Sequence, residues 1–171
     1  MRLIIILFSF FPSVVLGQDY SASEILNKIE KEGAKSIVQE YYLDHYVQAD
    51  FLQHIVDGDA KWVEIGVKLL RKTDASYTSN TYSALAWHLW RNPKNVLPYI
   101  NVKIHDGACD PGLYEGQDVT PYYLAMESAI IRLKAVTDEN ILKQRDLCLE
   151  KLVKMSLNWE ESLNKGSNND K

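Results

Sequence analysis

The sequence predicts an all-α protein that folds as one compact, irregular bundle of about six helices. Apolar residues recur at helical spacing along most of the chain, for example at Trp62, Ile65 and Leu69. Glycine, proline and capping residues divide the chain into segments of helical length. No segment alternates apolar and polar residues as a half-buried strand does. A short array of stacked antiparallel hairpins is the alternative, but the sequence lacks the fixed-period repeat typical of such arrays.

The first predicted helix starts from a serine cap at position 21 or 23 and ends near Gly33. Residues 34–56 favour a long helical stretch, which we expect to break near residues 48–50, with Asp50 as the cap of its second part. Gly58 is expected to end this stretch, because glycine readily adopts the left-handed conformation that follows many helices.

Two further helices form a predicted antiparallel hairpin. The first follows Asp59 and covers residues 61–71, and the second follows a cap at Asp74 and continues to Arg91. The dipeptide Asn92-Pro93 predicts a break and a restart, because proline is disfavoured inside a helix but suits its first position. A short helix through residues 96–100 follows.

The second half of the chain contains the one long stretch without helical periodicity, residues 101–119. Thr120-Pro121 then predicts the start of a helix that continues to Val136, and residues 137–139 cap a last helix that fades near Trp159. These two helices form a second expected hairpin. Residues 164–171 are polar and small, so we expect a disordered tail there.

The N-terminus has the pattern of a secretory signal peptide. One positive charge at Arg2 precedes an apolar core at residues 3–11, and the small residues Val15 and Gly17 precede a cleavage site before Gln18. The apolar core is far shorter than the roughly 20 residues that a membrane span needs. We therefore expect cleavage near Gly17-Gln18. The mature product, a single helical domain over residues 18–163 with no membrane span, is expected in the periplasm or outside the cell.

The charge balance limits the classes of partner. The chain carries 19 Lys and Arg against 23 Asp and Glu, a net charge of −4, which becomes −5 when Arg2 leaves with the signal peptide. Binding to nucleic acid or to an anionic membrane needs basic clusters, so we expect neither. A charged partner is expected to be another protein with a basic patch.

The two cysteines, Cys109 and Cys148, predict one disulfide, because an even count in an exported chain is typical of paired cysteines. The alternative is two buried free thiols. The disulfide would close a loop of about 40 residues and stabilise the fold by roughly 3–4 kcal/mol.

No motif dictates a chemistry, and we expect no cofactor, no metal and no enzymatic activity. His45 and His54 would project about 180° apart on one continuous helix, and we expect His88 at the boundary or surface. The sequence lacks the HExxH and CxxC spacings of metal sites. Glu40 and Asp44 would share a helix face, which is more typical of a solvated surface than of a desolvated catalytic pair.

Candidate binding residues gather in residues 101–119. Long loops without secondary structure are uncommon in compact domains and are often functional. A disulfide would anchor this one to the last helix, although a tethered crossover without a partner is the alternative. The predicted partner-binding residues are four acids around one tyrosine: Asp106, Asp110, Tyr114, Glu115 and Asp118.

Aromatic residues give a second candidate surface. The chain has 10 tyrosines and 4 tryptophans, and pairs of adjacent tyrosines at positions 41–42 and 122–123 cannot all face the core. Exposed aromatic side chains near charged residues are typical of protein-binding surfaces. The faces around Tyr41, Tyr42 and Trp87 are therefore the next candidates after the acidic loop.

Short patterns carry a resemblance to known proteins. Residues 58–62 (GDAKW), 73–75 (TDA) and 86–97 resemble a class of small exported bacterial helical proteins. Cys109-x-Pro111, followed by Val119-Thr120 and a helix, is similar to periplasmic immunity proteins of the type VI secretion kind. This resemblance implies a non-catalytic inhibitor of a toxin and transfers no functional residue. The expected function is an exported protein-binding module; a small helical hydrolase or a ligand-binding carrier is the alternative.

Overall fold

In a computed structural model, the chain is all-α, and the disulfide joins Cys109 to Cys148. The structure describes residues 21–41, 44–70, 72, 75–100, 104, 106–112 and 119–167, without the side chains of 45, 46, 75, 76, 106, 119 and 161–167. The signal-peptide pattern therefore lies outside the described residues. Within them the helices are α1 (Ala22–Glu32), α2 (Ala34–Tyr41), α3 (His45–Asp57), α4 (Ala60–Leu69), α5 (Ala75–Arg91), α6 (Pro93–Val96), α7 (Val119–Lys134) and α8 (Leu142–Ser167).

Three short 3-10 helices connect these elements: η1 (Leu97–Tyr99), η2 (Asp106–Cys109) and η3 (Glu139–Ile141). Eight α-helices are described where the sequence predicted about six. The predicted stretch over residues 34–56 contains two of them, and the short helix predicted after Asn92-Pro93 begins at Pro93 as α6.

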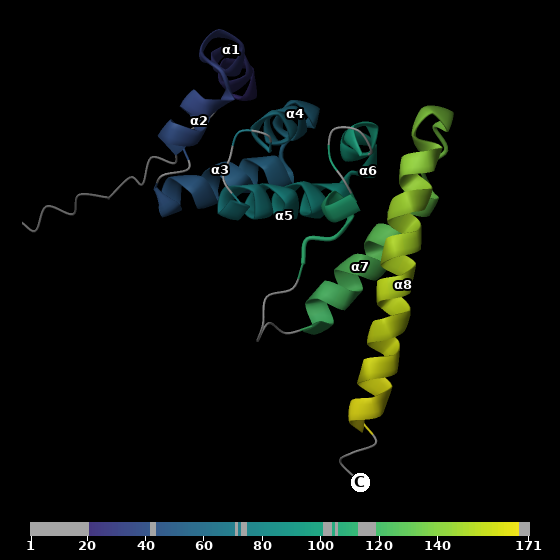
Figure 1. Cartoon of the computed structure of the whole chain (residues 1–171). Helices are drawn as coiled ribbons and strands as arrows, with labels where there is room; N and C mark the ends of the chain where they lie inside the picture. Colours follow the sequence, from purple (N-terminus) through teal and green to yellow (C-terminus); the bar gives the residue numbers. More distant parts are fainter. Residues whose placement is uncertain are drawn as a thin grey trace, which may run out of the picture.

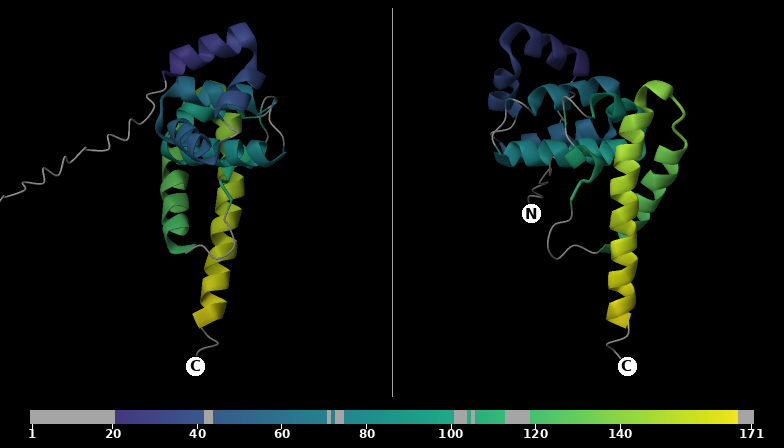
Figure 2. Two further views of the ribbon diagram at one scale, coloured as in Figure 1. Left: turned by 90° about the vertical axis from the view of Figure 1, so that its left-hand side faces the viewer. Right: turned by 45° about the vertical axis from the view of Figure 1, so that its right-hand side comes forward.

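The helices form stacked layers crossed by one long hairpin. The pair α1–α2 packs on α4, and α4 packs on α3 and α5 (Figure 1). α7 and α8 form an antiparallel hairpin at one end of α5, and the hairpin extends below the layers (Figure 2). This arrangement leaves an inside corner between the layers and the hairpin.

One hydrophobic core runs through all of these elements. Its largest fully buried side chains come from α2 to α5 and from the segment that follows α6: Ile37, Phe51, Ile55, Ile65, Leu69, Leu85, Leu89, Trp90, Leu97, Ile100 and Ile104. The core continues into the α7–α8 hairpin through Leu133 and Leu152, with the disulfide inside it. Burying this apolar surface is the main driving force for folding.

The sequence predicted most helix starts correctly. The Asp59 carboxylate accepts hydrogen bonds from the backbone amides of Lys61 and Trp62, and Asp138 caps the turn that leads into α8. Pro93 occupies the first turn of α6, as expected. The predicted cap Asp74 lies outside the described residues.

The break in residues 34–56 was predicted in the wrong place. α2 ends at Tyr41 and α3 begins at His45, so residues 48–50 lie inside α3 and Asp50 is not a cap. The Asp44 carboxylate instead accepts a hydrogen bond of 3.2 Å from the backbone amide of Val47, which satisfies a first-turn donor.

Gly58 ends α3 for a different reason from the one predicted. Its φ is not positive; Gly33 and Gly112 are the described glycines in the left-handed region. A Cβ at position 58 would lie 2.3 Å from the Trp62 ring and 2.4 Å from the His54 carbonyl oxygen. Glycine is required here because Trp62 packs directly on its backbone.

α8 continues to Ser167, about two turns beyond the predicted fade near Trp159, so residues 164–167 are helical and not part of a disordered tail. Trp159 packs against α7, and this contact supports α8 past the end of the core. Residues 168–171 lie outside the described part of the chain.

Candidate functional site

Four aromatic side chains from three helices meet where α5 contacts the α7–α8 hairpin. The Tyr122 ring stacks on Trp159, with centroids 5.3 Å apart, and lies edge-on to Trp90 at 5.0 Å and to Trp87 at 5.9 Å. Trp87 and Trp90 also contact each other edge-on at 5.1 Å. Offset-stacked and edge-on pairs are the favourable arrangements of aromatic rings. We call these four residues the aromatic cluster.

The aromatic cluster is buried at its centre and partly exposed at its margins. Trp90 and Tyr122 are 1% and 5% exposed, whereas Trp87 and Trp159 are half-buried. The inner rings hold α5, α7 and α8 together, so the outer rings have a rigid support. Two partly exposed indoles therefore lie on a fixed support at the margin of the cluster.

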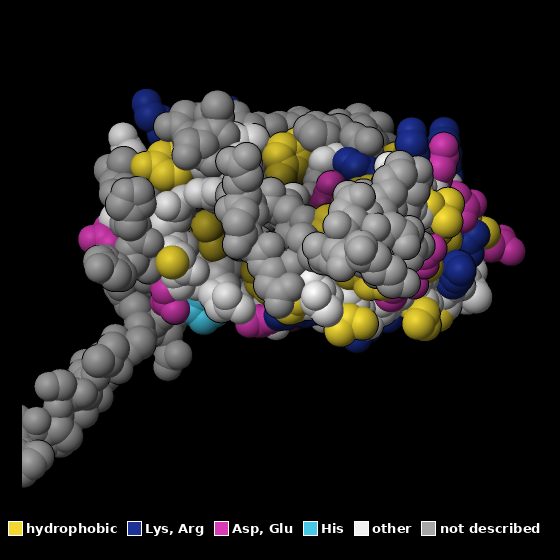
Figure 3. Space-filling view, turned by 90° about the horizontal axis from the view of Figure 1, so that it is seen from below, with side chains coloured by type: hydrophobic (Ala, Val, Ile, Leu, Met, Phe, Trp, Pro, Cys, Tyr) yellow, Lys and Arg dark blue, Asp and Glu magenta, His cyan; other side chains and the backbone are white. Residues whose placement is uncertain are grey.

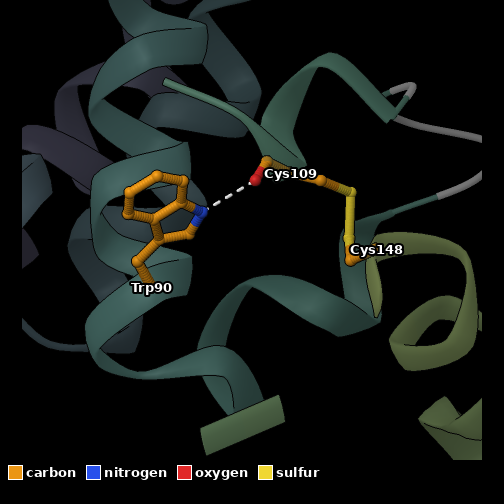
Figure 4. Close-up of a disulfide and its surroundings, with 3 residues drawn as sticks. All are labelled: Trp90, Cys109 and Cys148. Atoms are coloured by element: carbon orange, nitrogen blue, oxygen red, sulfur yellow. Dashed lines mark hydrogen bonds between the residues drawn. A yellow bond between two sulfur atoms is a disulfide. The ribbon is translucent and has the colours of Figure 1, made fainter. Parts of the chain in front are cut away.

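The segment from Cys109 to Gly112 is fixed beside this cluster. The indole Nε1 of Trp90 donates a 2.8 Å hydrogen bond to the carbonyl oxygen of Cys109, which the disulfide links to Cys148 of α8 (Figure 4). The Ser83 hydroxyl of α5 donates a 2.8 Å hydrogen bond to the Pro111 carbonyl oxygen. The start of the acidic loop is thus attached to both α5 and α8.

Asp110 connects this segment to α7. Its Oδ1 accepts hydrogen bonds from the Tyr122 hydroxyl and from the backbone amide of Gly112, the latter at 2.9 Å. Burial raises the pKa of the Tyr122 hydroxyl above its usual range, and the Asp110 carboxylate raises it further. Asp110 is half-buried, so it holds the turn as well as contributing a negative charge to this corner.

The structure describes little of the other four predicted binding residues. The backbone of Asp106 lies in η2, which packs against α5 and α8, and its side chain lies outside the description. Tyr114, Glu115 and Asp118 lie outside the described residues.

A groove between α3 and α5 opens next to the same corner. Its volume is about 230 Å³, and Trp87 is one of its lining residues. None of its described lining residues is charged; they are Ala49, Leu52, Gln53, Val56, Asn80, Ser83, Ala84 and Trp87. Ser83 also holds Pro111, so the groove leads to the anchored segment. Viewed from below, hydrophobic side chains of the described residues reach the surface at several places (Figure 3).

The second candidate surface is only partly present. Tyr41 is buried and stacks on Phe51 at 5.2 Å, so it belongs to the core. Tyr42 lies outside the described residues, and Trp87 belongs to the aromatic cluster.

His88 is fully buried, contrary to the prediction of a boundary or surface position. Its Nδ1 lies 2.9 Å from the Ile55 carbonyl oxygen, and its Nε2 lies 3.1 Å from the Asn95 amide nitrogen. A neutral ring that donates from Nδ1 and accepts at Nε2 satisfies both contacts. Burial lowers the His88 pKa, and the ring joins α3, α5 and α6 as a structural residue.

No metal site is found among the remaining titratable groups that the structure describes. Within the described part of the chain, no three His, Cys, Asp or Glu side chains gather closely enough to hold a metal ion. Glu40 pairs with Lys28, whose ammonium group lowers the Glu40 pKa.

Among the described helices, none is sufficiently long and apolar to cross a membrane.

Comparison of the chain with protein-family models, with curated proteins and with solved structures finds no match in any of the three. The function is therefore argued from the site alone.

Sequence reasoning found Trp87, Trp90 and Tyr122 as aromatic residues but did not bring them together with Trp159. The spacing of Trp87 and Trp90 on one helix face was the available signal. No local pattern indicates which ring of another helix will pack there.

Proposed function

We propose that the chain is an exported, non-catalytic protein-binding module. Its binding surface would combine the outer tryptophans of the aromatic cluster, the uncharged groove and the acidic residues of the adjoining loop. In its most specific form the protein would neutralise a toxin or a hydrolase, as immunity proteins do.

The observation that carries the proposal is the position of Trp87. This half-buried indole lines the groove, contacts Tyr122 and lies on the same helix as Ser83, which donates a hydrogen bond to the Pro111 carbonyl oxygen. Interfaces gain most of their affinity from a few rigid aromatic anchors, whereas charges at the rim mainly raise the association rate. Trp87 contacts Tyr122, which donates a hydrogen bond to Asp110, so a fixed indole and a carboxylate are available for these two roles.

Export is proposed on two features. The apolar N-terminal segment has the order of a signal peptide, and the disulfide between Cys109 and Cys148 is typical of an oxidising compartment. The periplasm is the favoured location, because the sequence has no N-glycosylation acceptor site.

The groove gives no support to the hydrolase alternative. Its described lining carries hydroxyl and amide groups but no carboxylate, imidazole, thiol or amine. Hydrolysis needs a general base within hydrogen-bond reach of the nucleophile. We therefore propose that the groove binds a partner's side chains and carries out no chemistry.

Binding kinetics with the partner captured from the native compartment test the proposal. Trp87→Ala should shorten the lifetime of the complex by about thirtyfold, since loss of such an anchor costs about 2 kcal/mol or more. Glu115→Gln with Asp118→Asn should instead slow association and weaken its dependence on salt.

Ile131→Ala is the matched control, because Ile131 is 68% exposed on α7 and lies outside the groove and the aromatic cluster. It should leave both rates unchanged. Circular dichroism must show unchanged helicity in every variant. If a protein with a neutral linker at residues 113–118 and Ala at position 87 binds as well as the parent, the proposed surface is wrong.

A further inference from the structure

A second cavity lies at the opposite end of the hairpin contact, where α6 approaches the end of α7. Its volume is about 410 Å³, within the range of small-molecule sites. Arg91, Lys94 and Arg132 contribute cationic side chains to its lining, and Asn92 and Asn95 contribute amides. The described lining residues include no carboxylate.

Three cations around one cavity are unusual in this chain, whose net charge is −4. Asp57 of α3 pairs with Arg91 and offsets one of these three charges. The three cationic side chains and the Asp57 carboxylate together carry a net charge of about +2. This charge is opposite in sign and similar in size to that of a phosphate monoester at neutral pH.

The Arg132 side chain is fixed at the edge of the cavity by a hydrogen bond to α5. Its Nη1 donates a 2.9 Å hydrogen bond to the Trp90 carbonyl oxygen, one of the last carbonyl groups of α5. A fixed guanidinium loses little further freedom when it binds an anion, and its planar donors suit phosphate oxygens. Lys94 has no described ion-pair partner, so its ammonium group remains available.

Apolar and amide groups complete the cavity. Pro93 and Val136 are buried and form an apolar wall together with Ala135. Asn95 is oriented by His88, at 3.1 Å, so its amide is also fixed. Charged donors beside an apolar wall would bind a ligand that carries an anionic group on an apolar body.

We infer that this cavity binds a small organic phosphate, with Arg91, Lys94 and Arg132 around the phosphate and Pro93 and Val136 against the organic part. The inference is independent of the proposed protein-binding function, because none of these residues lines the groove. The cavity would give the protein a ligand-binding site in addition to its protein-binding surface.

Calorimetric titration of the purified, disulfide-bonded protein with phenyl phosphate tests the inference. We expect binding at one site, weaker binding of benzoate and of inorganic phosphate, and a Kd that rises with ionic strength. Amide NMR signals of Lys94, Asn95 and Val136 should shift on titration.

Lys94→Gln should raise the Kd about tenfold, because it removes a charged donor. Lys134→Gln is the matched control: it makes the same charge change at an exposed position of α7 outside the cavity, and it should leave the Kd unchanged. The inference is overturned if phenyl phosphate produces neither heat nor shifts at millimolar concentration. It is equally overturned if both variants weaken binding to the same extent, or if an acidic peptide binds there and phenyl phosphate does not.

Discussion

The indole Nε1 of Trp90 donates a hydrogen bond to the carbonyl oxygen of Cys109, so the centre of the aromatic cluster and the disulfide share one contact. Tyr122 packs against Trp90 and donates a hydrogen bond to Asp110, one residue after Cys109. The disulfide, the aromatic cluster and the start of the acidic loop therefore form one connected unit. Its connections give rise to specific predictions for stability.

Cys148→Ala should lower the free energy of unfolding by about 3–4 kcal/mol, because the disulfide closes a loop with a sequence separation of 39 residues. Urea denaturation of the oxidised protein measures the change. Cys109→Ala and the double variant should lose the same amount, and reductant should destabilise the parent but none of the variants. A parent that is equally stable with and without reductant would contradict this prediction.

Tyr122→Phe should lower the free energy of unfolding by about 1–3 kcal/mol, since the Asp110 carboxylate loses a buried donor. Tyr123→Phe is the matched control. Its hydroxyl donates to the exposed Glu160, so its loss should cost well under about 1 kcal/mol. Equal effects of the two substitutions would show that Tyr122 does not support the turn.

The raised Tyr122 pKa adds a pH dependence to that experiment. Above the ordinary tyrosine pKa of 10.0 the unfolded chain releases this proton while the folded protein retains it, so stability falls as the pH rises. Denaturation at pH 9 and pH 11 measures the fall. In Tyr122→Phe the loss of stability between pH 9 and pH 11 should be smaller than in the parent. An equal loss in both proteins would show that Tyr122 is not its cause.

His88→Gln should lower the free energy of unfolding by about 2–4 kcal/mol, because the Ile55 carbonyl and the Asn95 amide lose well-placed partners. The lowered His88 pKa also predicts that stability declines as the pH falls below 6.5, when the unfolded chain binds a proton that the buried ring does not.

Denaturation at pH 7.5 and pH 5 separates these effects. The difference in stability between the two pH values should be smaller in His88→Gln than in the parent. The same difference in both proteins would place the pH dependence elsewhere.

Gly58→Ala tests the close approach of Trp62. Helix propensity alone predicts a small gain from this substitution. The overlap of a Cβ with the Trp62 ring and the His54 carbonyl predicts instead a loss of about 1–3 kcal/mol. The sign of the change in the free energy of unfolding therefore distinguishes the two explanations.

The helix starts and the disulfide could be predicted from the sequence because they depend on local chemistry. The Asp59 carboxylate accepts hydrogen bonds from the backbone amides of Lys61 and Trp62, and Pro93 stands in the first turn of α6, where proline is tolerated. The two cysteines allowed one pairing within the chain. The break between α2 and α3 was misplaced because both Asp44 and Asp50 are acceptable caps in isolation.

The sites depend on contacts between distant parts of the chain, and no local pattern contains these. His88 is buried because Ile55 and Asn95 satisfy both of its nitrogen atoms, and neither is its neighbour in sequence. Tyr122 and Trp159 meet only when the hairpin of α7 and α8 has formed.

Site-specific photo-cross-linking in the native compartment shows whether a protein binds at the groove and the adjoining Trp87. A benzophenone amino acid would replace Asn80 or Gln53, which both line the groove and leave Trp87 in place. The control position is Lys31, an exposed residue of α1 that does not line the groove. We expect one discrete cross-linked species of the same mass from positions 80 and 53, and none from position 31. Cross-links that are absent from the groove, or that form equally at position 31, would show that the proposed surface is wrong.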